Sequence, residues 1–294
     1  MKSSIILIAN PAAKKVSGKK VAMASYYLQS KGFAVEVLYT HKRGDAEKLA
    51  KEAVSRRPYL VIAGGGDGTF NEVANGLAGT DVPMAILPLG TTNVLARELD
   101  VSDKVQNAME KALRKKSARC SLGKITFTYL SPPLSRYFIL MAGIGFDAMA
   151  VYGTRQTMKK YSGQGAYIFS GLKTLLKFHP STLTFAVDGK EYEGYSGIIG
   201  NGAKYGGPFS VTPDAQLSDP VLFVCIFKGR KRLDVARYVF GILTGRHLKY
   251  RDVEYIRAKH IVIRGSACVQ IDGDYVGMTP AEVEVVPDAL NLIV

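Results

Sequence analysis

The sequence predicts two folded domains of different class: an α/β domain over residues 1–122 and an all-β domain over residues 123–286. Two observations carry this prediction. Strand-like and helix-like segments alternate through the first part, which is typical of a parallel sheet with helices on both faces. The second part consists mostly of strand-like segments separated by turn residues, which is typical of an antiparallel sandwich. We expect the last segment, residues 287–294, to return to the first domain.

The first domain is expected to contain four strands, each followed by helix. Apolar or alternating runs predict strands at Ser4–Ala9, Ala34–Tyr39, Tyr59–Ala63 and Pro83–Leu87. Helical patterns follow at Gly18–Lys31, Gly44–Arg56, Phe70–Leu77, Val94–Glu98 and Val105–Lys115. Ligands of such sheets bind beyond the carboxyl ends of the strands, so we expect the polar loops after these strands to line one crevice.

The second domain is expected to be built from short strands. The strand-like segments are Ile125–Tyr129, Tyr137–Ala142, Leu183–Val187, Glu191–Ile199, Val221–Phe227, His260–Arg264, Val269–Ile271 and Ala281–Val286. Asp188–Gly189 and Asp272–Gly273 are turn pairs of the kind that joins strands into hairpins. Two helix-like insertions interrupt the strands, at about Gly165–His179 and Leu233–Arg246.

Composition indicates a globular, cytoplasmic protein with an anionic partner. The 294 residues are 47% hydrophobic and carry a net charge of +14, which favours a nucleotide, a membrane surface or nucleic acid. No helix-turn-helix, zinc-finger or RNP signature appears, so nucleic acid is the least expected of these. The three cysteines and four histidines show no metal-site spacing. The longest nonpolar run, Tyr137–Phe146, is too short to span a bilayer.

The most informative motif is the glycine-rich turn after the third predicted strand. Its polar and glycine residues are Gly64, Gly65, Gly66, Asp67, Gly68, Thr69, Asn71 and Glu72, and a helical pattern follows. Glycines let a backbone approach a bulky ligand, and N–H groups that open a helix suit a phosphate. A carboxylate among such groups makes sense if a cation bridges it to the ligand. The motif therefore predicts a site for nucleotide phosphates and Mg²⁺.

A second glycine–threonine turn, Leu87–Asn93, follows the fourth predicted strand. Thr91 and Thr92 could bind phosphate oxygens or cap the next helix. The pairing with the first glycine-rich turn favours a shared nucleotide site, which includes Gly90 and Thr91. Asn10 and Thr40 follow the first two strands and are expected at the same edge of the sheet.

Two acidic motifs in the second domain remain open to more than one interpretation. Gly143–Ala148, GIGFDA, matches a relaxed dinucleotide fingerprint but lacks the acid about 20 residues later that would bind the ribose. We therefore expect only a close backbone approach there, with Asp147 facing the site. Asp272-Gly273-Asp274 is either an ordinary hairpin turn or part of an acidic site, and the residues alone leave both interpretations open.

Two basic segments with apolar residues also allow two interpretations. Met149–Val187 contains five Lys or Arg and no acid, and Lys228–Arg251 contains eight Lys or Arg and one acid, Asp234. Each is either the solvated face of a buried helix or a surface that docks on an anionic membrane.

Together these motifs resemble the diacylglycerol kinase catalytic family, and most closely its bacterial soluble lipid kinases. The eukaryotic diacylglycerol and sphingosine kinases share this catalytic region. The resemblance covers nearly the whole chain and rests on Asn10-Pro11, Thr40, GGGDGTFNEV, LPLGTTN, GIGFDA, Asn201 with Gly206-Gly207, PDAQLSDPVL and IDGD. The GGDGT turn with Asn-Glu is shared with NAD kinases and phosphofructokinases, so the resemblance implies their fold for the first domain.

The resemblance implies a Mg²⁺-dependent lipid kinase that transfers the γ-phosphate of ATP to a lipid hydroxyl, such as that of diacylglycerol, at a cleft between the domains. It implies that Asp272 is the proton acceptor. It implies Mg²⁺ ligands at Gln216, Asp219 and the Val221 carbonyl. The residues implied to serve the nucleotide are Asn10, Thr40, Gly64–Thr69, Asn71, Glu72, Gly90, Thr91 and Asp274. Asp67, Asp147, Asp219 and Asp274 resemble the family's acid network between metal and nucleotide.

This chain departs from the family pattern at three positions. Val94 replaces the usual Asp after LPxGTxN, and Asp274 replaces the usual Glu of the last motif. Pro220 replaces the Gly that usually follows the metal-loop Asp, here Asp219. Proline fixes φ and removes an N–H, so the metal loop is the motif most affected.

Two other functions remain alternatives. One is a kinase of a soluble metabolite such as NAD, although the second motif of NAD kinases, of the form TPTGSTAY, does not occur. The other is a non-enzymatic regulator that binds a nucleotide or a lipid. The expected partners are ATP and a lipid alcohol presented at an anionic membrane, with peripheral association of the protein with the inner membrane surface. The sequence does not specify the lipid and leaves a homodimer open.

Overall fold

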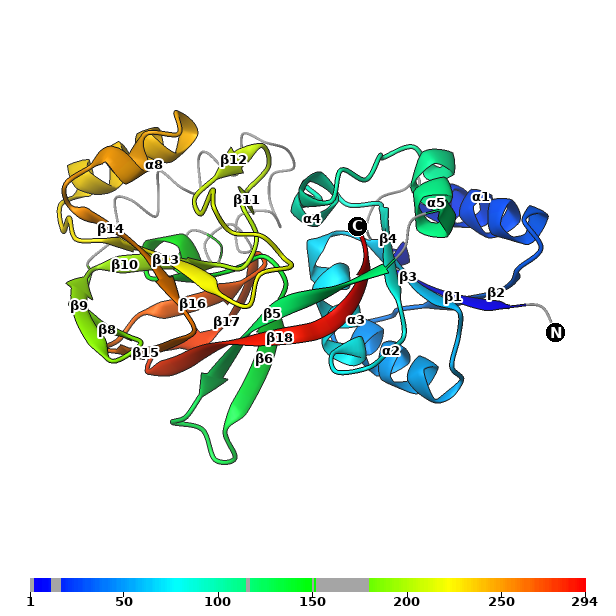
Figure 1. The fold of residues 1–294 in the computed structure, drawn as a ribbon, viewed down its shortest axis with the longest axis horizontal. Helices are drawn as coiled ribbons and strands as arrows, with labels where there is room; N and C mark the ends of the chain where they lie inside the picture. Colours follow the sequence, from blue (N-terminus) through cyan, green and yellow to red (C-terminus); the bar gives the residue numbers. More distant parts are fainter. Residues whose placement is uncertain (1–2, 12–16, 115–116, 150, 152–179) are drawn as a thin grey trace. The chain divides into compact units, whose positions relative to one another are not determined.

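The computed structural model describes residues 3–11, 17–114, 117–149, 151 and 180–294 (Figure 1). The chain divides into two compact units. The first contains Met1–Leu122, Gly206–Pro208 and Pro287–Val294, and the second contains Gly123–Tyr205 and Phe209–Val286. Two strands, β5 (Ser117–Phe127) and β18 (Ala281–Ile293), have residues in both units. None of the described helices has the length and apolar character that a membrane span requires.

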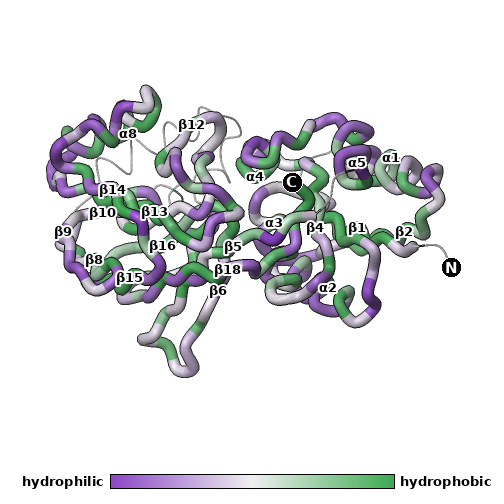
Figure 2. The backbone as a smooth tube through the Cα atoms, viewed as in Figure 1, coloured by the Kyte–Doolittle hydropathy of each residue, from purple (hydrophilic) through white to green (hydrophobic). Residues whose placement is uncertain are grey.

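The first unit has the predicted parallel sheet. Its strands run in the order β2 (Ala34–Tyr39), β1 (Ser4–Ala9), β3 (Leu60–Gly65) and β4 (Met84–Pro88), and all three pairings are parallel. Strands β1, β3 and β4 are almost wholly buried, as expected of parallel strands with both faces covered. Strand β1 is largely hydrophobic in Figure 2.

Helices cover both faces of this sheet, which confirms the predicted α/β class. Helices α1 (Ser17–Ser30) and α5 (Val105–Arg114) pack on one face, where residues such as Leu28 and Met109 meet Leu7 and Ile62. Helices α2 (Asp45–Ser55) and α3 (Asp67–Leu77) lie together on the other face (Figure 1). A Cβ at Gly76 would lie 2.6 Å from Ala50 Cβ, so glycine allows these two helices to approach closely.

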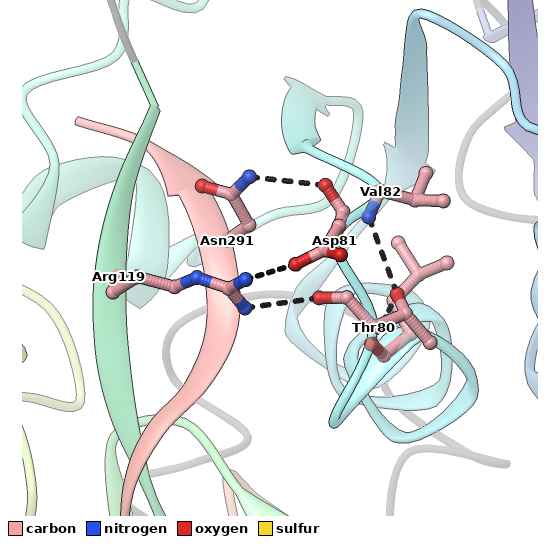
Figure 3. A network of polar contacts seen from close by, with 6 residues as sticks. Thr80, Asp81, Val82, Arg119 and Asn291 are labelled. Atoms are coloured by element: carbon pink, nitrogen blue, oxygen red, sulfur yellow. Dashed lines mark hydrogen bonds and ion pairs between the residues drawn. The ribbon is translucent and has the colours of Figure 1, made fainter.

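Polar contacts tie the end of the chain to the loop that precedes β4 (Figure 3). Asn291 on β18 donates from Nδ2 to the Asp81 carbonyl at 3.1 Å. Arg119 on β5 donates to the Thr80 carbonyl at 3.1 Å and forms an ion pair with Asp81. Leu292 also pairs with Met84 of β4 in parallel register. The last residues of the chain therefore complete the sheet of the first unit.

The second unit contains two antiparallel sheets, which confirms the predicted sandwich class. One has the strand order β14 (Val253–Ala258), β13 (Leu222–Phe227), β10 (Ser196–Gly200), β7 (Met141–Ile144), β16 (Cys268–Ile271) and β17 (Asp274–Met278). The other pairs β18 with β15 (His260–Arg264), then β8 (Leu183–Val187) and β9 (Lys190–Gly194), and includes β5 with β6 (Leu134–Phe138). The large buried side chains of its core include Phe127, Phe138 and Phe185.

Two predicted strands prove to be pairs of strands. The segment Tyr137–Ala142 is divided between β6 and β7, because the N–H groups of Ile139, Leu140 and Met141 donate to the Asp272 carboxylate. The segment Glu191–Ile199 is divided at Tyr195, where the chain passes from one sheet to the other as β9 ends and β10 begins.

Other elements differ from the prediction in extent. Strand β5 begins at Ser117, eight residues before the predicted start at Ile125, and β14 was not predicted. Helix α3 begins at Asp67, within the glycine-rich turn. The predicted helix at Leu233–Arg246 is present as α8 (Arg232–Leu243), followed by the short 3-10 helix η2 (His247–Lys249). The predicted helix at Gly165–His179 lies outside the described residues. A two-stranded ribbon of β11 (Lys204–Tyr205) and β12 (Phe209–Ser210) precedes the loop to β13.

Candidate functional site

The polar loops after the parallel strands meet at the carboxyl edge of the first unit's sheet. Asn10 follows β1 and donates its N–H to the Gly64 carbonyl at 2.8 Å. Thr40 follows β2, donates its N–H to the Ala9 carbonyl at 3.0 Å and is buried. The parallel register Ala9↔Gly64 places the end of β1 beside the first glycine of the glycine-rich turn.

The two glycine turns are in direct contact. The N–H groups of Leu89 and Gly90 donate to the Gly65 carbonyl at 2.7 and 3.1 Å. A Cβ at Gly90 would lie 2.7 Å from Gly66 Cα and 2.6 Å from Asn93 Oδ1, so a larger residue would push the turns apart. The two motifs that the sequence paired are thus parts of one structure. Thr91 follows Gly90 and is exposed beside it.

The first turn of α3 presents backbone N–H groups without a side-chain cap. Gly66 is the N-cap residue and makes no side-chain cap hydrogen bond. Thr69 packs against Gly65 so closely that a Cβ there would overlap its side chain. Asp67 and Gly68 complete this turn. Uncapped N–H groups at a helix start, beside a backbone without side chains, form a surface that suits an anion.

Asn71 and Glu72 have structural partners within this unit. Asn71 is buried, and its carbonyl and Oδ1 accept from Asn75 Nδ2 at 2.9 and 3.1 Å. The Glu72 carboxylate accepts the N–H groups of Gly44 and Ala46 at 2.9 and 3.2 Å, at the start of α2. Glu72 therefore joins α3 to α2, and a contact with a nucleotide stays a prediction.

Asp67 caps a second helix. Its Oδ1 accepts the Leu95 N–H at 3.1 Å, at the start of α4 (Val94–Glu98). Burial raises the pKa of the Asp67 carboxyl above its usual range, while the N–H groups of Leu95 and Val94 act in the opposite direction. An ionised Asp67 would repel a phosphate at the neighbouring glycines unless a cation lay between them. The Mg²⁺ ion predicted from the glycine-rich motif would relieve this repulsion, and it stays a prediction.

Asn93 is a residue that sequence reasoning missed. It has a left-handed backbone with φ of 47°, and its Nδ2 donates to the Gly90 carbonyl at 3.1 Å. Its Oδ1 is buried and has no hydrogen-bond partner among the described residues. That oxygen lies where the two glycine turns meet, so it is available to a ligand's donor group. The sequence signal for Asn93 was its position as the last residue of the LPLGTTN motif.

In the second unit, Asp272 forms part of a two-residue hairpin between β16 and β17. Ile271 pairs with Asp274, and the positive φ angles of Asp272 (46°) and Gly273 (85°) define a type I′ turn. The Asp272 carboxylate accepts three backbone N–H groups, from Ile139 at 2.7 Å, Leu140 at 2.9 Å and Met141 at 3.0 Å. Asp272 therefore does lie in a hairpin turn, which was one of the two interpretations of this motif. The three hydrogen bonds fix the direction of its carboxylate. Asp274 begins β17 and is half-buried.

A chain of hydrogen bonds leads from this hairpin to Asp147. The Gly273 N–H donates to Gln270 Oε1 at 2.8 Å, and Gln270 Nε2 donates to Asp147 Oδ2 at 2.6 Å. The Tyr205 hydroxyl donates to the other oxygen of Asp147. Burial raises the pKa of Asp147, while these two donors lower it, and burial beside Asp147 raises the pKa of Tyr205 well above its usual value. Gln270 and Tyr205 were not predicted as site residues.

At Gly143 the close neighbour is the Asp147 side chain, and the predicted close approach of the GIGFDA backbone to a ligand stays a prediction. A Cβ at Gly143 would overlap the Asp147 carboxylate and lie 2.6 Å from Gln270 Nε2. The partners of Asp147 are a phenol and an amide, and those of Asp67 are backbone N–H groups. The acid network that the resemblance implies through metal and nucleotide stays a prediction.

The predicted metal residues lie around a tight turn before β13. The Asp219 N–H donates to the Gln216 carbonyl at 3.0 Å, so these two residues close one turn. Val221 immediately precedes β13 and is buried. These residues offer oxygen ligands: a side-chain amide, one carboxylate and a backbone carbonyl. Oxygen is the ligand type that a hard cation such as Mg²⁺ prefers. Across the described part of the chain, no cluster of three His, Cys, Asp or Glu could hold a metal on its own.

An apolar cavity of about 120 Å³ lies in the second unit, beside α8. Apolar side chains make up most of its wall, and its polar groups include Asp147 and Tyr205. The full lining comprises Ile144, Phe146, Asp147, Ser196, Gly197, Ile198, Tyr205, Phe209, Phe227, Val235, Tyr238, Val239, Ile242 and Leu243. The cavity therefore offers an apolar space with a carboxylate–phenol pair in its wall.

Comparison with known proteins finds similarity along nearly the whole chain. The family model of the diacylglycerol kinase catalytic domain matches residues 4–125, and that of the YegS C-terminal NAD kinase beta sandwich-like domain matches residues 141–294. A diacylglycerol kinase of Bacillus subtilis (strain 168) is 29% identical over 289 residues, which cover 96% of this chain and 93% of the relative.

Solved structures share the fold. The crystal structure of a diacylglycerol kinase from Bacillus anthracis str. Sterne matches with a TM-score of 0.69 and 23% identity, over 99% of this chain and 96% of that chain. Yeast NADH kinase complexed with NADH matches with a TM-score of 0.53 and 10% identity, over 99% of this chain and 83% of that chain. These matches show that the chain shares its fold with those structures.

Proposed function

Because the chain belongs to the diacylglycerol kinase catalytic family, we propose that it is an ATP-dependent kinase that phosphorylates the hydroxyl group of a lipid, with diacylglycerol as the first candidate. One observation carries the nucleotide half of this proposal. The two glycine turns touch at the carboxyl edge of the parallel sheet, beside the uncapped start of α3. Such a surface suits the phosphates of a nucleotide.

The residues of the first unit would bind and orient ATP. The backbone of Gly64–Thr69 and Gly90 would approach the phosphates closely because no side chain intervenes. Thr91 and Asn93 Oδ1 would offer polar contacts at the same edge of the sheet. Catalysis of phosphoryl transfer depends mainly on such positioning and on neutralising charge.

A Mg²⁺ ion would be held by Gln216, Asp219 and the Val221 carbonyl, with water completing its shell. When bound, the ion would offset negative charge on the phosphate oxygens. Asp67 lies beside the glycine turns, and its raised pKa indicates an unfavourable site for an isolated negative charge. A cation would remove that penalty when the nucleotide binds.

Asp272 would orient the acceptor hydroxyl and accept its proton. Its three backbone donors hold the carboxylate in one direction, which preorganises it for this task. Phosphoryl transfer is largely dissociative, so the hydroxyl proton can leave late and a strong base is not required.

The apolar cavity favours a lipid over a sugar or nucleotide as acceptor. Aliphatic and aromatic side chains of β7, β10 and α8 surround it, so it suits an alkyl segment. Its volume of about 120 Å³ accommodates part of a chain rather than a whole diacyl lipid.

The proposal is tested by offering labelled ATP and Mg²⁺ with a panel of acceptors. The panel contains micelles of diacylglycerol, phosphatidylglycerol, a sphingoid base and undecaprenol, together with NAD in solution. We expect label in one extracted lipid, with diacylglycerol converted to phosphatidate. Label in NAD alone, or ATP binding without transfer to any acceptor, would contradict the proposal.

A pair of glycine variants connects that activity to the glycine turns. Gly90→Ala forces a Cβ against Gly66 and Asn93 and should weaken ATP binding strongly. Gly18→Ala is the matched control, because no atom of the described residues outside its own helix and chain neighbours lies within 4 Å of its Cβ position. Equal ATP affinity in the two variants would contradict the placement of the nucleotide.

A further inference from the structure

Helix α8 exposes an apolar stripe that the proposed chemistry does not use. Leu233, Phe240 and Leu243 are 81%, 61% and 51% exposed, and Ala236 is also exposed. Their spacing of three and four residues places them along one side of the helix. Figure 2 shows hydrophilic and hydrophobic residues alternating along α8. Large exposed apolar side chains grouped in this way mark an interaction surface.

The opposite side fixes α8 firmly to the second unit. Val235, Tyr238 and Gly241 are buried. The Tyr238 hydroxyl accepts the Gly229 N–H at 2.7 Å and donates to Asp252. The exposed stripe is therefore the outer face of a well-anchored helix rather than part of a frayed end.

The segment that contains the stripe is rich in positive charge. Segment 228–251 carries eight Lys or Arg and a single acid, Asp234. Lys228 and Arg237 form ion pairs with Glu254 and Asp252. The other six basic side chains are exposed: Arg230, Lys231, Arg232, Arg246, Lys249 and Arg251. An apolar stripe flanked by exposed cations matches a partner surface that has an anionic outer layer and an apolar layer beneath it.

We propose that α8 docks on an anionic membrane, with Leu233, Phe240 and Leu243 inserted among the lipid chains and the flanking cations at the headgroups. A second copy of this chain is disfavoured as the occupant, because two such faces would bring like charges together. This proposal rests on the proposed lipid-kinase function, because docking would bring the protein to its lipid substrate. The vesicle-binding test of the proposal, however, does not depend on catalysis.

The cavity and the docking surface share Leu243, and the cavity-lining Val239 precedes Phe240 of the stripe. Val239 and Leu243 line the cavity and are nevertheless 41% and 51% exposed, so the cavity wall continues to the outer face of the helix. A lipid leaving the bilayer beside α8 would thus pass from one apolar surface to another. The same helix both holds the protein at the membrane and forms a wall of the cavity.

The test is co-sedimentation of the full chain with vesicles, without ATP. One set is phosphatidylcholine alone, and the other contains phosphatidylglycerol as well. We expect binding to the anionic vesicles that weakens as salt rises, and little binding to the neutral ones. Equal binding to both sets, or binding to neither, would overturn the proposal.

The double variant Leu233→Ser, Phe240→Ser should lower partition into anionic vesicles by at least about tenfold, because two apolar side chains no longer enter the bilayer. The matched control is Met23→Ser, Tyr26→Ser on α1, where the side chains are 50% and 76% exposed. This control should bind like the unaltered protein. An equal loss in both double variants would overturn the assignment to α8.

Two further measurements separate the alternatives. If the α8 double variant converted a dimer to a monomer in solution without changing vesicle binding, the stripe would be an interface between copies and the proposal would be wrong. Transfer to a short-chain diacylglycerol dissolved as monomers tests the kinase function apart from docking. The α8 double variant should keep that activity while losing activity on vesicles, whereas failure of the kinase proposal would remove both activities in every variant.

Discussion

Two Asp-Gly hairpins in the second unit have the same local structure. Asp188 and Asp272 each have φ of 46°, and the glycines that follow have φ of 88° and 85°. Both are two-residue turns, one between β8 and β9 and one between β16 and β17. In both, the carboxylate accepts backbone N–H groups from a distant segment. Asp188 accepts those of Lys259 and His260, as Asp272 accepts those of Ile139 to Met141.

The surroundings distinguish the two hairpins. Asp188 is exposed, and the residue two positions before it is Ala186, which has no polar side chain. The corresponding residue before Asp272 is Gln270, which is buried and joins the turn to Asp147. An Asp-Gly turn with a carboxylate that caps backbone N–H groups is therefore a structural device in this fold. A catalytic role for Asp272 depends on what surrounds it rather than on the turn.

The largest expected difference between the hairpins is in turnover. Asp272→Asn should lower kcat by about 10²–10⁴-fold, as expected on loss of a general base. Asp188→Asn should leave kcat unchanged. Each change places an NH₂ group against backbone donors and should reduce the free energy of unfolding by about 1–3 kcal/mol. Steady-state kinetics with diacylglycerol micelles and thermal unfolding of both variants provide the comparison.

Gln270 tests whether the link to Asp147 matters. Gln270→Met keeps the volume but leaves the Gly273 N–H and Asp147 without this partner, which should cost about 1–3 kcal/mol of stability. We expect kcat to fall by roughly tenfold, because the hairpin is less well positioned, with the KM for ATP unchanged. A variant that is destabilised but fully active would show that Gln270 is structural only.

The turn glycines should give equal effects on stability in the two hairpins. Gly189→Ala and Gly273→Ala each force a side chain into positive φ, which should cost about 1 kcal/mol. Chemical denaturation measures both. Since the open space around these two Cβ positions is also the same, a difference well above 1 kcal/mol would show that the turns are not equivalent.

Asp67 extends the comparison to the first unit, because it also accepts backbone N–H groups but is buried enough to have a raised pKa. A raised folded-state pKa means that the native state holds the proton more tightly than the unfolded chain. This stabilising contribution is complete below the unfolded-state pKa and disappears as pH rises through the folded-state pKa.

Asp67→Asn removes the buried charge that forms at neutral pH while an acceptor oxygen remains for Leu95. We therefore expect its melting temperature, relative to that of the unaltered protein, to increase between pH 4 and pH 7. The effect should be the smallest of the series, within about 1 kcal/mol. A constant difference across this range would contradict the raised pKa.

Elements with strong local signals were predictable from the sequence. Strand β1 has the predicted bounds Ser4–Ala9, because an unbroken apolar run has few other local solutions. Asp188–Gly189 was predicted as a turn between strands, because that residue pair favours positive φ at both positions. For Asp272–Gly273 the same turn was one of two interpretations that the residues left open. The two glycine turns were paired correctly, because consecutive strands of a parallel sheet deliver their loops to one edge.

Features that depend on distant segments were not predictable. The division of Tyr137–Ala142 into β6 and β7 coincides with hydrogen bonds to Asp272, more than 130 residues away in the chain. The association of Gln270 and Tyr205 with Asp147 likewise requires the folded sandwich. Within one segment, the sequence offered no sign that Gly143 is needed because Asp147 folds back over it.

The most direct test of the account is transfer of label from ATP to diacylglycerol by three proteins in parallel: the unaltered chain, Asp272→Asn and Asp188→Asn. We predict labelled phosphatidate with the unaltered chain and Asp188→Asn, and almost none with Asp272→Asn. Absence of labelled lipid with the unaltered chain would contradict the proposed function. Equal labelling by the two variants would show that both hairpins are only structural.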